Sequence, residues 1–178
     1  MPKKYQVIYA DPPWRYDFSK SKTRKIENQY PTMSLQEIKD LVYDLPIDTN
    51  AVLYLWATAP KLLEALEVMK AWQFEYKTQA VWDKEIIGMG YWFRGQHEIL
   101  LVGVKGKFSP PLPEFRVSSV FKERRGKHSK KPEFVRDMIG ESFKEFDKLE
   151  LFARQKADGW DSWGNEVESD IKLTQTNE

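Results

Sequence analysis

The sequence contains no cysteine and only two histidines. The lack of cysteine excludes a disulfide framework, a thiolate nucleophile and metal sites built from thiolates. Two histidines are too few for a typical histidine-rich metal site, so we expect no metal. The chain has no apolar run near the ~20 residues that a membrane-spanning helix needs, and its N-terminus has no signal-peptide pattern. We therefore expect a cytoplasmic protein without a membrane partner.

The net charge is only +1, which gives the whole chain no electrostatic attraction to nucleic acid. The charges are nevertheless clustered. Residues 20–25 carry four cations and no acid, and residues 122–131 carry six cations and one acid. Both segments fall in predicted loops, where such clusters are typical of phosphate contacts, although a single basic run is more often solvated surface. The candidate phosphate contacts are Lys22, Arg24, Arg124 and Arg125.

Of the 178 residues, 41% are hydrophobic and 14% aromatic, which is typical of one globular domain. Apolar, β-prone runs predict strands at residues 5–10, 51–57, 74–84, 97–104 and 149–153, with short strands within 117–121 and 159–166. Strands that alternate with helices predict an α/β fold with a mostly parallel sheet. The polar sequence from residue 168 predicts a disordered tail, so we expect one domain over residues 1–167 and a tail over 168–178.

Three helices are predicted between these strands. Ser34 and Glu37 form a capping-box pattern that opens a helix to about Tyr43. Pro60 fits the first turn of a second helix, and Pro132 opens a third helix of about twelve residues. The apolar stripe of the second helix is expected to comprise Leu62, Leu63, Leu66, Met69 and Trp72.

The motif Asp11-Pro12-Pro13-Trp14 follows the first predicted strand directly. The two prolines end the strand, because neither can donate a ladder hydrogen bond. Asp11 is thus placed at the carboxyl end of a strand, where open α/β sheets bind their ligands. A carboxylate, the Pro12 carbonyl and the Trp14 ring together fit a purine with an exocyclic amino group, which needs two acceptors and a stacking face. A strand-to-turn junction with a capping Asp and a core Trp is the alternative.

Four segments, taken in this order, closely resemble the MT-A type family of adenine-N6 methyltransferases. They are Asp11-Pro12-Pro13-Trp14, Tyr30-Pro31-Thr32-Met33-Ser34, Trp92 to Gly106, and His128 to Glu133 followed by Leu149 to Arg154 and Gly164-Asn165-Glu166. The resemblance covers about residues 5–167. It implies a single-domain, Rossmann-like methyltransferase fold with the permuted, β-type motif order, S-adenosylmethionine as methyl donor and an adenine amino group as acceptor.

The resemblance also implies roles for individual residues. Asp11, Pro12, Pro13 and Trp14 would form the catalytic corner, in which Asp11 and the Pro12 carbonyl accept the amino hydrogens and Trp14 stacks on the base. Lys131 would bind the methionine carboxylate of the cofactor. The other cofactor contacts would be Arg154, Asn165 and Glu166, together with Asp11 and the backbone of Ile8, Tyr9 and Ala10.

The acceptor base would be surrounded by Tyr30, Trp92 and Glu98. Trp92 is either a wall of this pocket or a packed core aromatic, and Glu98 either holds its loop or touches the base. His128 is expected to order its loop rather than to contact the cofactor.

Three functions compete. A compact chain favours the bacterial or phage branch of the family and DNA as the substrate, whereas the same chemistry on RNA is hardly distinguishable by sequence. A non-catalytic nucleic-acid-binding subunit is disfavoured, because Asp11, Lys131 and Asn165 are all present. The segments between the motifs are short, so we expect loose sequence preference, or a homodimer or partner subunit that helps to recognise the target.

Overall fold

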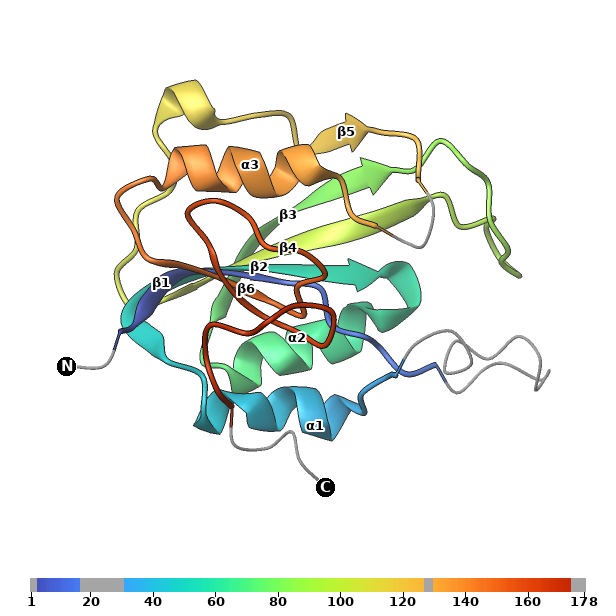
Figure 1. Cartoon of the computed structure of the whole chain (residues 1–178). Helices are drawn as coiled ribbons and strands as arrows, with labels where there is room; N and C mark the ends of the chain where they lie inside the picture. Colours follow the sequence, from blue (N-terminus) through green and yellow to red (C-terminus); the bar gives the residue numbers. More distant parts are fainter. Residues whose placement is uncertain (1–2, 17–30, 127–129, 174–178) are drawn as a thin grey trace.

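The structure is a computed structural model that describes residues 3–16, 31–126 and 130–173. These residues form a seven-stranded sheet in the order β5-β3-β4-β2-β1-β6-β7 (Figure 1). The strands are β1 (Tyr5–Ala10), β2 (Ile47–Thr58), β3 (Glu75–Asp83), β4 (His97–Lys105), β5 (Val120–Lys122), β6 (Lys148–Leu151) and β7 (Asp161–Trp163). Only β4 runs antiparallel to its neighbours. The predicted α/β fold with a mostly parallel sheet is confirmed.

Helices cover both faces of this sheet (Figure 1). One face carries α1 (Leu35–Asp40), which continues as the 3-10 turn η3 (Leu41–Tyr43), and α2 (Leu62–Ala71), which follows the turn η4 (Ala59–Lys61). The other face carries α3 (Glu133–Ser142), and η5 (Pro113–Phe115) lies in the connection between β4 and β5. The capping box is present as predicted: Ser34 Oγ accepts from the Glu37 amide, and the Glu37 carboxylate accepts from the Ser34 amide.

The central strand β1 has neighbours on both edges and helices over both faces. Its alternating side chains enter two cores: Ile8 and Ala10 pack towards α1 and α2, whereas Val7 and Tyr9 pack towards α3. A strand buried on both faces needs a near-continuous apolar sequence. This requirement explains why β1 and the middle of β2 were predictable as strands.

Two predictions differ from the structure in detail. Leu63 was assigned to the inner face of α2 but is 74% exposed, because Ala65, Val68 and Met69 form the buried stripe. The segment from residue 168 was expected to be disordered, yet its described part packs on the sheet. Leu173 is buried, and the Asp170 carboxylate accepts a hydrogen bond from the Ser162 amide of β7. Residues 174–178 lie outside the described residues.

No helix in the described part of the chain is long and apolar enough to cross a membrane.

Candidate active site

The carboxyl ends of the parallel strands β1, β2, β6 and β7 meet at one edge of the sheet, where a cavity of about 430 Å³ opens. The chain leaves β1 through α1 to β2 on one side, whereas β6 on the other side comes from the last third of the chain. Ligand sites of open α/β sheets lie at such a switch point. The cavity brings together nine of the residues singled out in the sequence: Asp11, Pro12, Pro13, Trp14, Glu98, Lys131, Arg154, Asn165 and Glu166.

Charged side chains form a series of ion pairs at this cavity. Lys131 Nζ lies 2.9 Å from an Asp11 carboxylate oxygen and 3.1 Å from Glu98 Oε2. Lys84 Nζ lies 3.3 Å from the other Glu98 oxygen, Oε1. The side chains of Lys131 and Glu98 are largely buried, and that of Asp11 is 26% exposed. Three segments distant in sequence are therefore held together by ion pairs at the cavity.

This arrangement determines the direction in which the pKa values of Asp11 and Lys131 are shifted. Burial raises the pKa of Asp11, and the neighbouring Glu98 charge raises it further, against the opposing effect of Lys131. Burial alone would lower the pKa of Lys131, but the facing Asp11 and Glu98 carboxylates raise it above its ordinary value. Lys131 thus stays charged. The pKa of Asp11 responds to both of its charged neighbours.

The Asp-Pro-Pro-Trp corner is rigid. The Trp14 amide donates to the Pro12 carbonyl at 2.9 Å, and the Met33 amide donates to the Pro13 carbonyl at 2.9 Å. Trp14 is 6% exposed, and its Nε1 donates to the Trp56 carbonyl at 3.2 Å. The Trp14 ring is therefore a fixed wall of the cavity, and one lone pair of the Pro12 carbonyl remains for a ligand.

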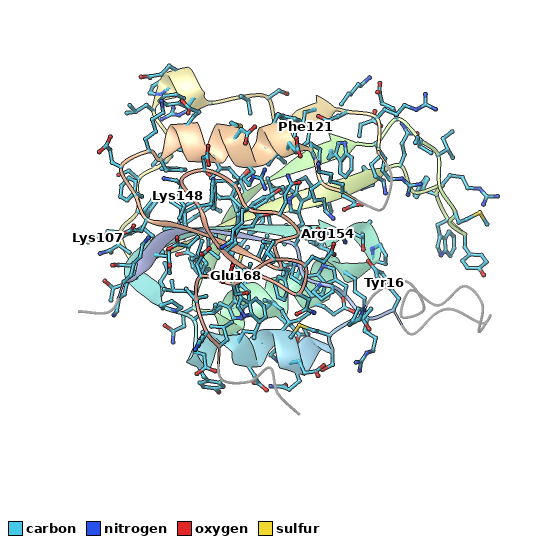
Figure 2. The ribbon with its side chains drawn as sticks, in the orientation of Figure 1. Tyr16, Lys107, Phe121, Lys148, Arg154 and Glu168 are labelled. Atoms are coloured by element: carbon cyan, nitrogen blue, oxygen red, sulfur yellow. The ribbon has the colours of Figure 1, made fainter. Side chains whose placement is uncertain are left out.

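Residues of β2 that the sequence analysis did not single out also form this wall. Trp56 Nε1 donates to Tyr9 Oη at 2.7 Å, and Lys131 Nζ lies 5.7 Å from the centre of the Trp56 ring. Thr58 Oγ1 lies 2.6 Å from Tyr16 Oη, and both residues line the cavity (Figure 2 labels Tyr16). Strand topology could have pointed to these residues. In a parallel pair, the carboxyl end of β2 lies beside the carboxyl end of β1, so residues that end β2 reach the same site.

The far side of the cavity is built by the chain after β6 and β7. Phe152 has φ +62°, a left-handed conformation that is costly for a residue with a side chain. This turn lets the Ala153 amide donate to the Trp163 carbonyl at 2.9 Å. A Cβ added at Gly164 would lie 2.2 Å from the Ala153 carbonyl oxygen, so only glycine fits the close approach of the two chain segments. Asn165 follows directly.

The polar groups on this side of the cavity fit S-adenosylmethionine. Lys131 supplies an ammonium for a carboxylate, and Asn165 and Glu166 supply acceptors for a ribose diol. Phe152 and Trp163 add apolar surface to the same cavity. Arg154 Nε lies 3.7 Å from Glu166 Oε1, which holds these two side chains near each other. A second cavity of about 280 Å³ adjoins the first through shared lining residues: Asp11, Lys131, Phe152, Arg154 and Glu166.

Other predicted site residues lie elsewhere. Tyr9 lines the second cavity, but Ile8 and Ala10 line neither of the two cavities described, because β1 is covered on both faces and paired on both edges. Trp92 is 94% exposed, so the alternative that it is a packed core aromatic is wrong, and it lines neither of the two cavities. Arg124 and Arg125 are exposed after β5. Four predicted residues lie outside the described part of the chain: Lys22, Arg24, Tyr30 and His128.

Among the described residues there is no group of three or more His, Asp or Glu side chains placed to hold a metal ion.

The α/β sheet, with an acidic, proline-rich corner at its switch point, defines the class as a Rossmann-like fold of the methyltransferase type. The family model described as MT-A70 matches residues 5–166, and the chain belongs to this family. The recognition made from the four sequence segments is confirmed.

Curated relatives agree with this family. The type II methyltransferase M.MunI of Mycoplasma sp. is 41% identical over 186 residues, which cover 93% of this chain and 78% of the relative. A putative N(6)-adenosine-methyltransferase MT-A70-like protein of Medicago truncatula is 29% identical, over 96% of this chain and 27% of its own length. The mouse N(6)-adenine-specific methyltransferase METTL4 is 29% identical, over 93% of this chain and 38% of its own length. The chain spans less than half of these two eukaryotic relatives.

Proposed function

We propose that the protein transfers a methyl group from S-adenosylmethionine to the N6 amino group of adenine in DNA. The observation that carries this proposal is the shared cavity of Asp11, the Pro12 corner and Lys131 with Asn165 and Glu166. One part of this set suits an amino group between two acceptors, and the other suits a carboxylate and a diol. The names of the MT-A70 relatives, which specify N(6)-adenine or N(6)-adenosine methylation, support the same chemistry.

DNA is preferred over RNA as the substrate because of how much of each relative's length this chain matches. M.MunI, which is named a type II methyltransferase, matches over most of both chains, whereas the plant protein named for adenosine matches over about a quarter of its length. RNA remains the second candidate, since an N6-methyladenosine RNA methyltransferase of Pyricularia oryzae is 26% identical over 92% of this chain.

The adenine N6 lone pair is delocalised into the ring, which makes the nitrogen a poor nucleophile. The Asp11 carboxylate and the free lone pair of the Pro12 carbonyl would each accept one amino hydrogen, which favours a pyramidal nitrogen with its lone pair directed at the methyl group. The bound cofactor supplies an electrophilic methyl group for direct transfer. Positioning and electrostatics then account for most of the rate, because no covalent enzyme intermediate is needed.

Lys131 would serve both the Asp11 corner and the cofactor. An ammonium has three N–H donors, and Asp11 and Glu98 take two of them. The third would serve the methionine carboxylate of the cofactor. The buried rings of Trp14 and Trp56 form an apolar wall of the cavity that Asp11 lines, and a charge beside such a wall is screened less than a charge in bulk water.

The experiment is methyl transfer from radiolabelled S-adenosylmethionine to single-stranded DNA, duplex DNA and RNA that contain adenine. Asp11→Ala is the inactive control, and Asp137→Asn, on the exposed side of α3, is the matched active control. We expect N6-methyladenine in DNA with wild type and Asp137→Asn but not with Asp11→Ala. Methylation of RNA alone would select the second candidate.

Binding of S-adenosylhomocysteine, measured by calorimetry, separates the remaining outcomes. Binding without transfer to any nucleic acid would show that the chain alone is not the enzyme and would direct the search to a partner subunit. The absence of both binding and transfer would contradict the proposal and favour a non-catalytic nucleic-acid-binding subunit.

A further inference from the structure

The connection between β3 and β4, residues 84–96, exposes its largest apolar side chains together. Tyr91 is 103% exposed, Trp92 94% and Phe93 90%, and we call these three residues the aromatic tip. Met89 and Ile87 of the same connection are also exposed. Five exposed apolar side chains within residues 87–93 indicate an interaction site, whereas exposed apolar residues scattered singly need no explanation.

The connection is folded rather than loose. The Gly88 amide donates to the Gly95 carbonyl at 2.8 Å, and the Lys84 amide donates to the Gln96 carbonyl at 2.8 Å. A Cβ added at Gly90 would lie 1.9 Å from the Phe93 carbonyl oxygen, so the turn that presents the tip requires glycine. The aromatic side chains are therefore held outward by a closed turn, and they do not fold back onto the core.

The aromatic tip lies on the catalytic edge of the sheet. Strand β3 runs parallel to β1, so the connection leaves β3 at the same edge as the Asp-Pro-Pro-Trp corner. Figure 2 shows its side chains projecting beyond the ends of β3 and β4. The chain re-enters the sheet at β4, where Glu98 reaches the cavity and pairs with Lys131 at 3.1 Å. Only a few residues of the chain therefore separate a ligand on the tip from Glu98 in the cavity.

Exposed cations flank the tip. Arg94 lies in the connection itself, and Lys122, Arg124 and Arg125 follow along β5 and the segment after it. This basic segment is fixed to the end of β3, because the Glu123 amide donates to Asp83 O at 3.2 Å and the Arg125 amide donates to Lys84 O at 3.1 Å. In addition, Trp82 Nε1 donates to Glu123 O at 2.8 Å. An apolar tip beside a fixed cationic strip is complementary to a polyanion with stackable bases.

We propose that the aromatic tip is a wedge for double-stranded DNA, with Trp92 and Phe93 inserted at the position that the target adenine leaves. This inference rests on the proposed function and specifies duplex DNA as its substrate. An adenine inside a duplex must leave the stack to reach Asp11 in the cavity. Apolar side chains inserted between base steps fill the gap and stabilise the unstacked state, while the cationic strip holds the phosphates.

The test compares the full-length wild-type protein with the double variant Trp92→Ala plus Phe93→Ala. Tyr43→Ala is the matched control, because Tyr43 is a 78% exposed aromatic at the end of η3, near the opposite edge of the sheet. Methylated adenines are first mapped in treated plasmid DNA. Duplexes of that sequence then carry the target adenine either fully paired or opposite an abasic position, where it is already unpaired.

We expect the double variant to lose at least tenfold in kcat/KM on the paired duplex and less than threefold on the duplex with the unpaired adenine. Tyr43→Ala should match wild type on both. In a duplex with 2-aminopurine at the target position, wild type should raise the fluorescence severalfold on binding and the double variant should not. If plasmid DNA is not methylated, 2-aminopurine flanked by randomised sequence is used instead.

Several outcomes would overturn the wedge. They are an equal loss on both duplexes, no loss on either, and methylation of single strands or RNA only. A change in oligomeric state by light scattering, with 2-aminopurine fluorescence unchanged, would assign the tip to a contact between copies of the chain. Unstacking without methyl transfer would refute the proposed function and keep the wedge, whereas methyl transfer that is insensitive to the double variant would refute the wedge alone.

Discussion

Lys131 Nζ lies 2.9 Å from the carboxylate of Asp11, although 120 positions separate the two residues in the sequence. Glu98 shares the same ammonium at 3.1 Å, so two carboxylates face one cation. Lys84 pairs with the other Glu98 oxygen at 3.3 Å, so the charges of these four side chains balance. The ion pairs tie the end of β1 and the start of β4 to the segment before α3. The Asp-Pro-Pro-Trp corner is consequently held in place before any ligand binds.

Asp11→Asn should abolish catalysis while the fold survives. The amide has one acceptor oxygen in place of the two of the carboxylate, and its N–H groups cannot pair with the Lys131 ammonium, which itself only donates. Lys131 keeps Glu98 as a partner, so no unpaired charge is left buried. We expect methyl transfer to fall by roughly 10²-fold or more, with the melting temperature within a few degrees of wild type.

This expectation is measured by steady-state transfer and by thermal unfolding followed by circular dichroism. A variant that keeps more than a tenth of wild-type activity would remove Asp11 from the reaction. A collapse of the melting temperature would instead make it a structural residue.

Glu98→Gln should shift the acid limb of the pH–rate profile to lower pH. Burial raises the pKa of Asp11, the Glu98 charge raises it further, and Lys131 opposes both. Removal of the Glu98 charge therefore lowers the pKa of Asp11. If catalysis requires ionised Asp11, the variant keeps its activity to a lower pH than wild type does, and kcat/KM measured across pH 5–9 shows the shift.

The control for this shift is Glu114→Gln, on an exposed turn, which should leave the acid limb in place. A limb that moves to higher pH would contradict this electrostatic assignment.

Arg124→Ala and Arg125→Ala should each weaken duplex binding in a salt-dependent way. Each phosphate contact releases counterions, so the loss of one contact lowers the slope of log Kobs against log salt by about 1. Fluorescence anisotropy of a labelled duplex at several salt concentrations gives this slope. Lys144→Ala, with a side chain that is 61% exposed near the C-terminus of α3, should leave it unchanged. Unaltered slopes in both arginine variants would mean that the strip beside the aromatic tip does not contact phosphates.

Local pattern and strand order account for most of what the sequence predicts correctly. Strand β1 and the middle of β2 are buried on both faces, so their sequences are nearly continuous in apolar residues. The Ser34 capping box is a local signal. The motif of Asp11 to Trp14 locates the cavity, since the end of a parallel strand is a ligand edge regardless of the rest of the fold.

What the sequence does not predict depends on contacts between distant segments. The ion pair of Lys84 with Glu98 and the hydrogen bond of Trp56 with Tyr9 form only once strand register is set, and neither carries a local pattern. Trp92 was expected in a pocket wall because of the family resemblance, or in a core because a large aromatic side chain is often buried. Its exposure follows from the closed glycine turn around it, which is a property of backbone geometry rather than of hydrophobic pattern.

Gly164→Ala should weaken cofactor binding without touching a reacting group. A methyl group at this position would meet the backbone of Ala153, with its Cβ 2.2 Å from the carbonyl oxygen and 2.7 Å from the nitrogen. Backbone cannot swing aside as a side chain can, so the segments after β6 and β7 must separate and move Asn165 away from Arg154. We expect a loss of roughly 1–3 kcal/mol in unfolding free energy and weaker S-adenosylhomocysteine binding by calorimetry. Gly126→Ala is the matched control, because a Cβ there meets no atom of the described residues within 4 Å, and it should change neither quantity. If Gly164→Ala binds S-adenosylhomocysteine as tightly as Gly126→Ala does, the turn after β7 does not hold the cofactor.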